Sequence, residues 1–293
     1  MSKLLPHKLL SGLSLSLGLS LGMLLSAGPV SAASDKLTPQ VAEALVTKSG
    51  LADQLPAIAP SVATGLTTNP GFASNLGEAE LQIVLRAFSN AYAPTRLATD
   101  ITAELPGQLK AAPAQDALKW LESDLGRKIT ALEDAASKQA SDPSVMEQAQ
   151  ETYQRLSPRR AERYERLVKA SEVAESSTQL LINTSIGTAY GVASTTGSTT
   201  PPDIDAIRRE IERNREEMTD TLRGQFSVLF SSAYQTLSEA ELDQYIAFME
   251  SPSGRAYNKA MAAAIDKAMV KAAKDAGRQI GDAVRQKKAQ TPA

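Results

Sequence analysis

The chain has 293 residues, is 42% hydrophobic and carries a formal net charge of −2 at pH 7, so it has no strong overall attraction to nucleic acid or anionic lipid. It contains no cysteine, and its single histidine, His7, lies in a segment that we expect to be removed. Nucleophilic sites that need an imidazole or a thiol are therefore excluded from the mature protein, as are zinc, copper and haem sites built on Cys or His. Carboxylate-only chemistry stays open.

Residues 1–32 predict a secretory signal peptide. Lys3 and Lys8 form a basic start, an apolar stretch follows at 9–25, and Val30-Ser31-Ala32 has the small residues of a cleavage site. A transmembrane anchor would need about 20 predominantly apolar residues, and serines and glycines interrupt this stretch. Without a cysteine, a thioether-linked lipid anchor is excluded. We therefore expect cleavage after Ala32 and a periplasmic or secreted protein.

The rest of the chain reads as helix. Strong helix formers dominate, aromatic residues make up only 4%, and sustained period-two alternation is absent. Helix starts are predicted at Thr38-Pro39 and Ser157-Pro158, where a capping hydroxyl precedes a proline at the first helical position. Ser238 and Glu241 predict a capping box at the start of another helix. The expected fold class is all-α, a helical bundle.

Three amphipathic helices are predicted towards the C-terminus. One runs from Asp203 to about Tyr234, one follows the capping box, and one runs from Pro252 to about Arg285. Apolar residues recur on one face of each helix at steps of three or four residues, a pattern that is stable only when the face is packed. The apolar faces of the first two include Met218, Leu222, Phe226 and Leu229, and then Leu242, Tyr245, Ile246 and Met249.

Two short segments, 120–127 and 248–255, nearly repeat each other. Each has an aromatic and an aliphatic residue, then Glu-Ser, two variable positions and Gly-Arg, and their separation is the size of one domain. A second similar pair, 45–53 and 167–175, occurs in the same order. We therefore predict two related helical halves. The expected divisions are a degenerate repeat at 33–140, a connecting segment at 141–159, a second repeat at 160–285 and a disordered tail at 286–293.

The second half resembles a known family. Leu237 to Leu242, Phe248, and Ser251-Pro252-Ser253-Gly254-Arg255 resemble an exported bacterial helical family catalogued as domain of unknown function number twenty-fifty-nine. Its pattern is a Ser-x-x-Glu helix start, an aromatic residue ten positions on, and Ser-Pro-x-Gly followed by Lys or Arg. The resemblance covers roughly Leu222 to Met261. It implies a secreted all-helical module and brings no assigned activity, cofactor or catalytic residue.

The first half departs from the family pattern. Asp124 stands in place of Pro252, and Ala111 and Ala114 occupy the positions of the acidic helix start. If the first half is a second copy of the family, it is a degenerate one.

The repeated segments supply the candidate site, which is either a structural elbow or a binding site. In the structural interpretation, Ser251 and Ser123 cap new helices, the glycines allow close approach of the preceding helix, the aromatic residues fill the corner, and the arginines bridge to the glutamates. In the alternative, Glu250 and Arg255 bind an anionic or carbohydrate ligand at the helix N-terminus. The candidate residues are Trp120, Glu122, Gly126, Arg127, Phe248, Glu250, Ser251, Pro252, Gly254 and Arg255.

Three classes of function fit these observations. The leading one is an interaction or structural module of the cell envelope, whose partner would be an envelope protein or a cell-wall component and not nucleic acid. The second is a carboxylate-based envelope polysaccharide hydrolase using Glu122 and Glu250. The third is a carrier of a small apolar ligand, which would require an apolar cavity. The basic residues after Arg255 predict at most weak contact with a membrane surface. No cofactor or metal site is predicted.

Overall fold

The computed structural model describes residues 35–60, 78–139, 143–193, 205, 209 and 212–290. The predicted signal peptide and its cleavage site lie outside these residues, as does most of the predicted helix before Glu212. The residues from Ser34 onward form one compact unit. Its first part contains α1 (Pro39–Lys48), α2 (Leu51–Gln54), α5 (Glu78–Ala91), α6 (Pro94–Glu104), α7 (Ala111–Leu121) and α8 (Asp124–Gln139), with 3₁₀ turns at Leu55–Ala57 and Leu105–Gly107.

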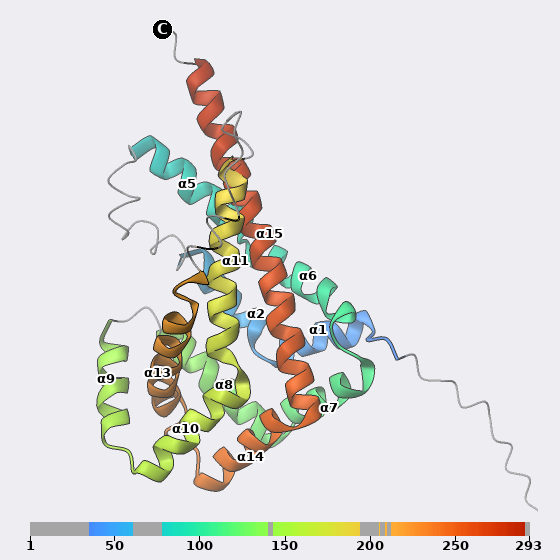
Figure 1. The fold of residues 1–293 in the computed structure, drawn as a ribbon. Helices are drawn as coiled ribbons and strands as arrows, with labels where there is room; N and C mark the ends of the chain where they lie inside the picture. The colour runs from blue at the N-terminus through green and yellow to red at the C-terminus, as the bar shows by residue number, and fades with distance from the viewer. Residues whose placement is uncertain are drawn as a thin grey trace, which may run out of the picture. The chain divides into compact units, whose positions relative to one another are not determined.

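The second part is also helical (Figure 1). It contains α9 (Pro143–Gln154), α10 (Pro158–Ser171), α11 (Val173–Ala193), α13 (Arg215–Ala233), α14 (Glu239–Glu250) and α15 (Pro252–Gln290), which therefore includes the first residues of the predicted tail. Within the described ranges no β-strand occurs, and an isolated bridge joins Lys36 to Lys110. The predicted all-α class is confirmed. None of the described helices is long and apolar enough to cross a membrane.

The predicted helix starts are confirmed by their hydrogen bonds. The Thr38 hydroxyl accepts from the Val41 amide at 3.4 Å, and the Ser157 hydroxyl accepts from the Arg160 amide at 3.3 Å. At α14 the Ser238 hydroxyl accepts from the Glu241 amide at 3.2 Å, and the Glu241 carboxylate accepts from the Ser238 amide at 2.8 Å. These bonds satisfy donors that a helix start would otherwise leave without partners, so the starts can be read locally.

Helix α13 buries a different face from the predicted one. Phe226 and Leu229 are only half-buried, whereas the most buried positions include Ser227 and Ser231. Their hydroxyls donate to carbonyls of their own helix at 2.9 and 2.7 Å, so burial leaves neither hydroxyl without a partner. The buried face thus combines the two serines with Thr219 and Val228, and Phe226 and Leu229 line a cavity described below.

The structure has two apolar cores, and each contains residues from both halves of the sequence. The first gathers buried residues of α1, α5, α6 and α7 around the middle of α15, including Met261 and Ala264. The second gathers Ile129, Tyr164, Tyr234 and the buried face of α14. Helix α15 also packs along α11. The C-terminal helix therefore completes the core of the first half, because its small alanines let several helices approach it closely.

The basic residues of α15 meet acids of the first half. Lys267 lies 2.8 Å from the Glu104 carboxylate, and Lys271 lies 2.6 Å from that of Asp100. Both acids belong to α6, and Glu104 is its last residue. Part of the basic charge that suggested membrane contact is therefore paired within the protein.

Candidate functional site

The two repeated segments fold into closely similar corners. In the first, the Ser123 hydroxyl accepts from the Gly126 amide at 3.0 Å and donates to the Trp120 carbonyl at 2.6 Å. In the second, the Ser251 hydroxyl accepts from the Gly254 amide at 2.9 Å and donates to the Phe248 carbonyl at 2.7 Å. Each serine thus joins the end of one helix to the start of the next, with Asp124 or Pro252 as the first residue of the new helix.

The glycines in these corners leave no room for a side chain. A Cβ placed on Gly126 would lie 2.0 Å from the Trp120 carbonyl oxygen, and one on Gly254 would lie 1.9 Å from that of Phe248. Backbone atoms cannot yield as the end of a flexible side chain can, so both positions require glycine for the sharp change of direction.

The arginines of the corners do not bridge to the glutamate carboxylates as predicted. Arg127 and Arg255 each donate to the backbone carbonyl of the preceding glutamate, Glu122 or Glu250. The carboxylates reach other partners: Glu122 lies 3.9 Å from Lys48, and Glu250 binds the guanidinium of Arg166 through both oxygens at 2.7 and 2.5 Å. The prediction is wrong because i,i+5 geometry brings the long arginine back over the helix end, where free carbonyls carry negative partial charge.

The aromatic residues of the two corners lie against each other. The rings of Trp120 and Phe248 are stacked with centroids 4.6 Å apart and planes inclined by 7°. Trp120 also stacks on Tyr245 at 6.2 Å. Both Trp120 and Phe248 contact the first and the second apolar core. The corners therefore meet at the boundary between the cores, in addition to turning the chain.

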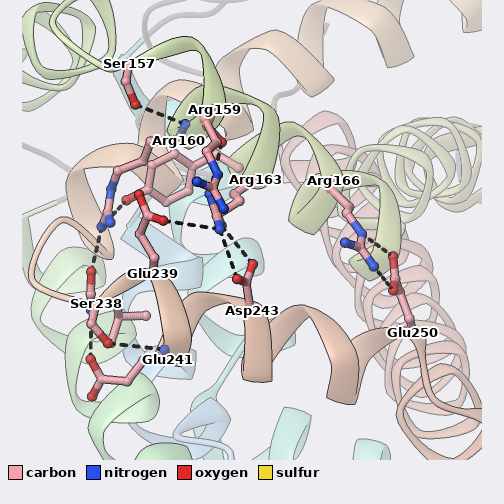
Figure 2. A network of polar contacts seen from close by, with 12 residues as sticks. Ser157, Arg159, Arg160, Arg163, Arg166, Ser238, Glu239, Glu241, Asp243 and Glu250 are labelled. Carbon is pink, nitrogen blue, oxygen red and sulfur yellow. Dashed lines mark hydrogen bonds and ion pairs between the residues drawn. The ribbon is translucent and has the colours of Figure 1, made fainter.

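Helix α10 clamps α14 with charged pairs (Figure 2). Arg163 binds both carboxylate oxygens of Asp243 at 2.7 and 3.0 Å and lies 3.3 Å from Glu239. These hydrogen bonds lower the pKa of Asp243, and the Arg166 guanidinium likewise lowers the pKa of Glu250. Glu250 is therefore held as a carboxylate inside an ion pair, which leaves it unsuited to bind an anion at the start of α15.

A further arginine of α10 caps the end of α13. The Arg160 guanidinium donates to the backbone carbonyls of Tyr234, Gln235 and Leu237, at 3.3, 3.3 and 2.7 Å. The hydroxyl of Tyr164 also donates to the Tyr234 carbonyl, at 3.3 Å. The loop that follows α13 would otherwise leave several backbone carbonyls without donors. Because Arg160 supplies these donors, it holds Tyr234 in place.

A cavity of about 740 Å³, here called the aromatic cavity, lies beside the Trp120 and Phe248 stack. Helices α8, α11, α13, α14 and α15 supply most of its lining, and α2, α7, α9 and α10 supply the rest together with neighbouring loop residues. Among the predicted site residues it is lined by Trp120, Gly126 and Phe248, and the remaining seven lie outside its lining. Its other aromatic and large apolar lining residues include Phe226, Leu229, Phe230, Tyr234, Tyr245, Met249, Tyr257 and Met261.

The aromatic cavity contains a carboxylate, Glu133, that the sequence analysis missed. Its Oε1 accepts hydrogen bonds from the hydroxyls of Tyr234 and Tyr245, at 2.6 and 3.0 Å. Burial among these side chains raises the pKa of Glu133, although both tyrosine hydrogen bonds act in the opposite direction. Glu133 is half-buried and is one of the residues that line the cavity.

A local signal for Glu133 does exist in the sequence. Ile129, Leu132 and Ala136 follow the spacing of one helix face, and Glu133 falls among them. An acid on an apolar face is informative because burying a charge requires a partner. The partners lie 101 and 112 residues further along the chain, so the sequence does not name them.

The segment from the end of α13 to most of α15 matches a family model. Residues 230–282 match the family described as "Uncharacterized protein conserved in bacteria (DUF2059)". The predicted resemblance is confirmed for this segment, whereas the prediction that the first half is a second copy stays a prediction. No curated protein and no solved structure matches the chain.

The DUF2059 segment holds one of the two corners and a large share of the cavity wall. It includes Tyr234, Tyr245, Phe248 and Tyr257, which line the aromatic cavity. Glu133 and Trp120, which contact these residues, come from outside it. The DUF2059 segment and the first sequence half thus build the cavity together.

Proposed function

We propose that the protein is an exported carrier that binds a small, largely apolar ligand in the aromatic cavity. The observation that carries the proposal is the cavity itself, whose volume of about 740 Å³ and aromatic walls are typical of sites for small organic molecules. Export rests on the predicted signal peptide at residues 1–32, and its test is the mass of the mature protein recovered from the periplasm, expected to begin at Ala33.

The surface supports a carrier over an interaction module. Among the large hydrophobic residues of the described ranges, only Met146 and Leu181 are exposed, and they are separate in the sequence. A large contiguous apolar patch would mark a docking face for another protein, and these two side chains lie on different helices, α9 and α11. The aromatic cavity instead gathers many aromatic and large apolar side chains around one space.

The acids support a carrier over a polysaccharide hydrolase. A glycosidase needs two carboxyl groups facing one cleft, one of them with a raised pKa. Glu122 and Glu250 line no part of the aromatic cavity, and the pKa of Glu250 is lowered by Arg166. Glu133 is the one carboxylate in the described lining. The arrangement therefore offers a binding site without the paired acids.

The proposal is tested with Nile red, a neutral apolar dye whose fluorescence rises in apolar surroundings. The protein beginning at Ala33 is titrated with the dye and compared with Ala136→Phe, which fills the cavity from α8, and Ala131→Phe, on the exposed face of the same helix. We expect Ala136→Phe to bind about tenfold more weakly and Ala131→Phe to bind like the unmodified protein. Failure of the dye to bind, or equal binding by both variants, would overturn the carrier.

A further inference from the structure

Glu133 offers an unused hydrogen-bonding position inside the aromatic cavity. Both tyrosine hydroxyls donate to Oε1, and Oε2 accepts no hydrogen bond from the residues that the structure describes. Because Glu133 lines the cavity, this oxygen can accept a donor from a molecule bound there. The two tyrosines also fix the direction of the carboxylate, so the position is preorganised.

The described lining of the cavity carries negative charge and no positive charge. Glu133 is the one charged residue in the described lining, and neither lysine nor arginine is among those residues. An anionic ligand such as a fatty acid would meet a like charge in a site of low polarity, with no cation to offset it. A cation would instead neutralise Glu133, and it would relieve the cost of burial that raises the pKa of this carboxyl group.

The aromatic walls favour the same charge. The faces of aromatic rings carry negative potential, so they attract ammonium and guanidinium groups. Tyr245 and Tyr234 bring their rings together edge to face, with centroids 5.7 Å apart, beside the carboxylate that both contact. Trp120 also stacks on Tyr245, with ring centroids 6.2 Å apart. The carboxylate therefore lies among aromatic side chains that line the same cavity.

From this geometry we propose that the aromatic cavity selects an amphiphile with one cationic nitrogen, which binds the Glu133 Oε2 while its apolar body lies against the aromatic walls. The inference rests on the proposed carrier function and names the chemical class of its ligand. It assigns to Glu133 a role beyond anchoring two tyrosines.

Three probes with one apolar body test the charge preference. These are 1-pyrenemethylamine, 1-pyrenemethanol and 1-pyrenecarboxylate, which are cationic, neutral and anionic at pH 7. The chain contains one tryptophan, Trp120, in the cavity wall, so loss of its fluorescence by energy transfer to pyrene reports binding near the site. Titrations at about 0.15 M salt screen attraction of the amine to the protein exterior. We expect the amine to bind about tenfold more tightly than the alcohol, and the carboxylate to bind most weakly.

Two glutamine variants locate the preference. Glu133→Gln keeps an oxygen that can accept from both tyrosines and should bring the affinities for amine and alcohol to within about twofold of each other. Glu122→Gln removes one negative charge outside the cavity and should retain the full preference. Circular dichroism verifies that both variants fold, and the ranking of the three probes on the unmodified protein stands without any variant.

The outcomes separate the two proposals. If the alcohol binds as tightly as the amine, or if the carboxylate binds most tightly, the cation preference is overturned while the carrier stands. The preference is also overturned if Glu133→Gln retains it, because the selection would then come from another group. If neither Nile red nor any pyrene probe binds, the carrier itself is overturned.

Discussion

Trp120 and Phe248 occupy equivalent places in two similar corners and stack on each other, with ring centroids 4.6 Å apart. Trp120 is the next-to-last residue of α7 and Phe248 lies two residues before the end of α14, and each is followed by the same serine-capped turn. The contact joins the two apolar cores, since both rings pack against each of them. It also forms part of the wall of the aromatic cavity, which connects the repeated sequence to the proposed binding site.

The stack predicts a measurable coupling between the two rings. We expect Trp120→Ala and Phe248→Ala each to lower the free energy of unfolding by about 2–3 kcal/mol, since both rings are half-buried. The double variant should lose less than the sum, by about 0.5–1.5 kcal/mol, because the stacking is then removed only once. Urea unfolding of the four proteins measures the coupling. Trp120→Ala combined with Phe88→Ala, whose ring stacks on Tyr92, is the control and should be additive.

Replacing glycine by alanine should have opposite effects on stability in the two corners and within α13. Gly254→Ala places a Cβ against the Phe248 carbonyl, and we expect it to destabilise the fold by about 3 kcal/mol or more, with Gly126→Ala behaving alike. Gly224 lies in α13, where an added Cβ would meet nothing within 4 Å. Gly224→Ala should therefore raise the free energy of unfolding by about 0.5–1 kcal/mol. Thermal unfolding compares the three variants. An unaltered melting temperature for Gly254→Ala would show that the corner relaxes easily.

The charged contacts of α14 predict weakening in acid. Lys128 and the Ser238 amide lower the pKa of Glu241 to about 2, and Arg163 and Arg166 lower those of Asp243 and Glu250. The folded protein therefore binds fewer protons at these carboxyls than the unfolded chain, so this stability is present above the unfolded pKa values and is lost as the pH falls through the folded ones.

Urea unfolding between pH 6 and pH 2 measures that loss. Glu250→Gln should be destabilised at pH 6 and should approach the unmodified protein as the pH falls through the lowered pKa of the folded Glu250 carboxyl. Glu43→Gln, on the exposed face of α1, serves as the control and should follow the unmodified protein throughout. A constant difference for Glu250→Gln at every pH would contradict an electrostatic origin.

Glu133 predicts the opposite pH dependence. Burial raises its pKa in the folded protein, so the folded state binds more protons than the unfolded chain and stability falls as the pH rises from the unfolded to the folded pKa. Glu133→Gln keeps the accepting oxygen without the buried charge and should be more stable than the unmodified protein at pH 7. The difference should shrink towards pH 4.

A second variant separates charge from hydrogen bonding at the same position. Glu133→Ala leaves the hydroxyls of Tyr234 and Tyr245 without their acceptor and should cost about 1–3 kcal/mol relative to Glu133→Gln. The free energy of unfolding from urea titrations at pH 7 and pH 4 checks both variants. Equal stability of the glutamine and alanine variants would show that the tyrosines find other partners.

The features that the sequence predicted are those made by neighbours along the chain. The caps at Thr38, Ser157 and Ser238 depend on hydrogen bonds that span three residues. The helical class follows from residue propensities and periodicity, which also act locally. Because such interactions involve only neighbouring residues, the sequence by itself determined where they form, even though packing is needed to make the helices stable. The Ser-x-x-Gly corner was recognisable for the same reason.

The features that only the tertiary structure decided join residues far apart. The pairing of Glu250 with Arg166 and of Glu133 with two tyrosines depends on which helices pack together, and many partners of the same type compete in the sequence. The buried face of α13 was wrongly predicted, because the face of a helix that is buried depends on which helices pack against it, and here that face includes Ser227, Val228 and Ser231. Phe226 and Leu229 of the predicted face line the aromatic cavity instead. Local chemistry thus determined the helices and corners, and long-range packing determined where a ligand can bind.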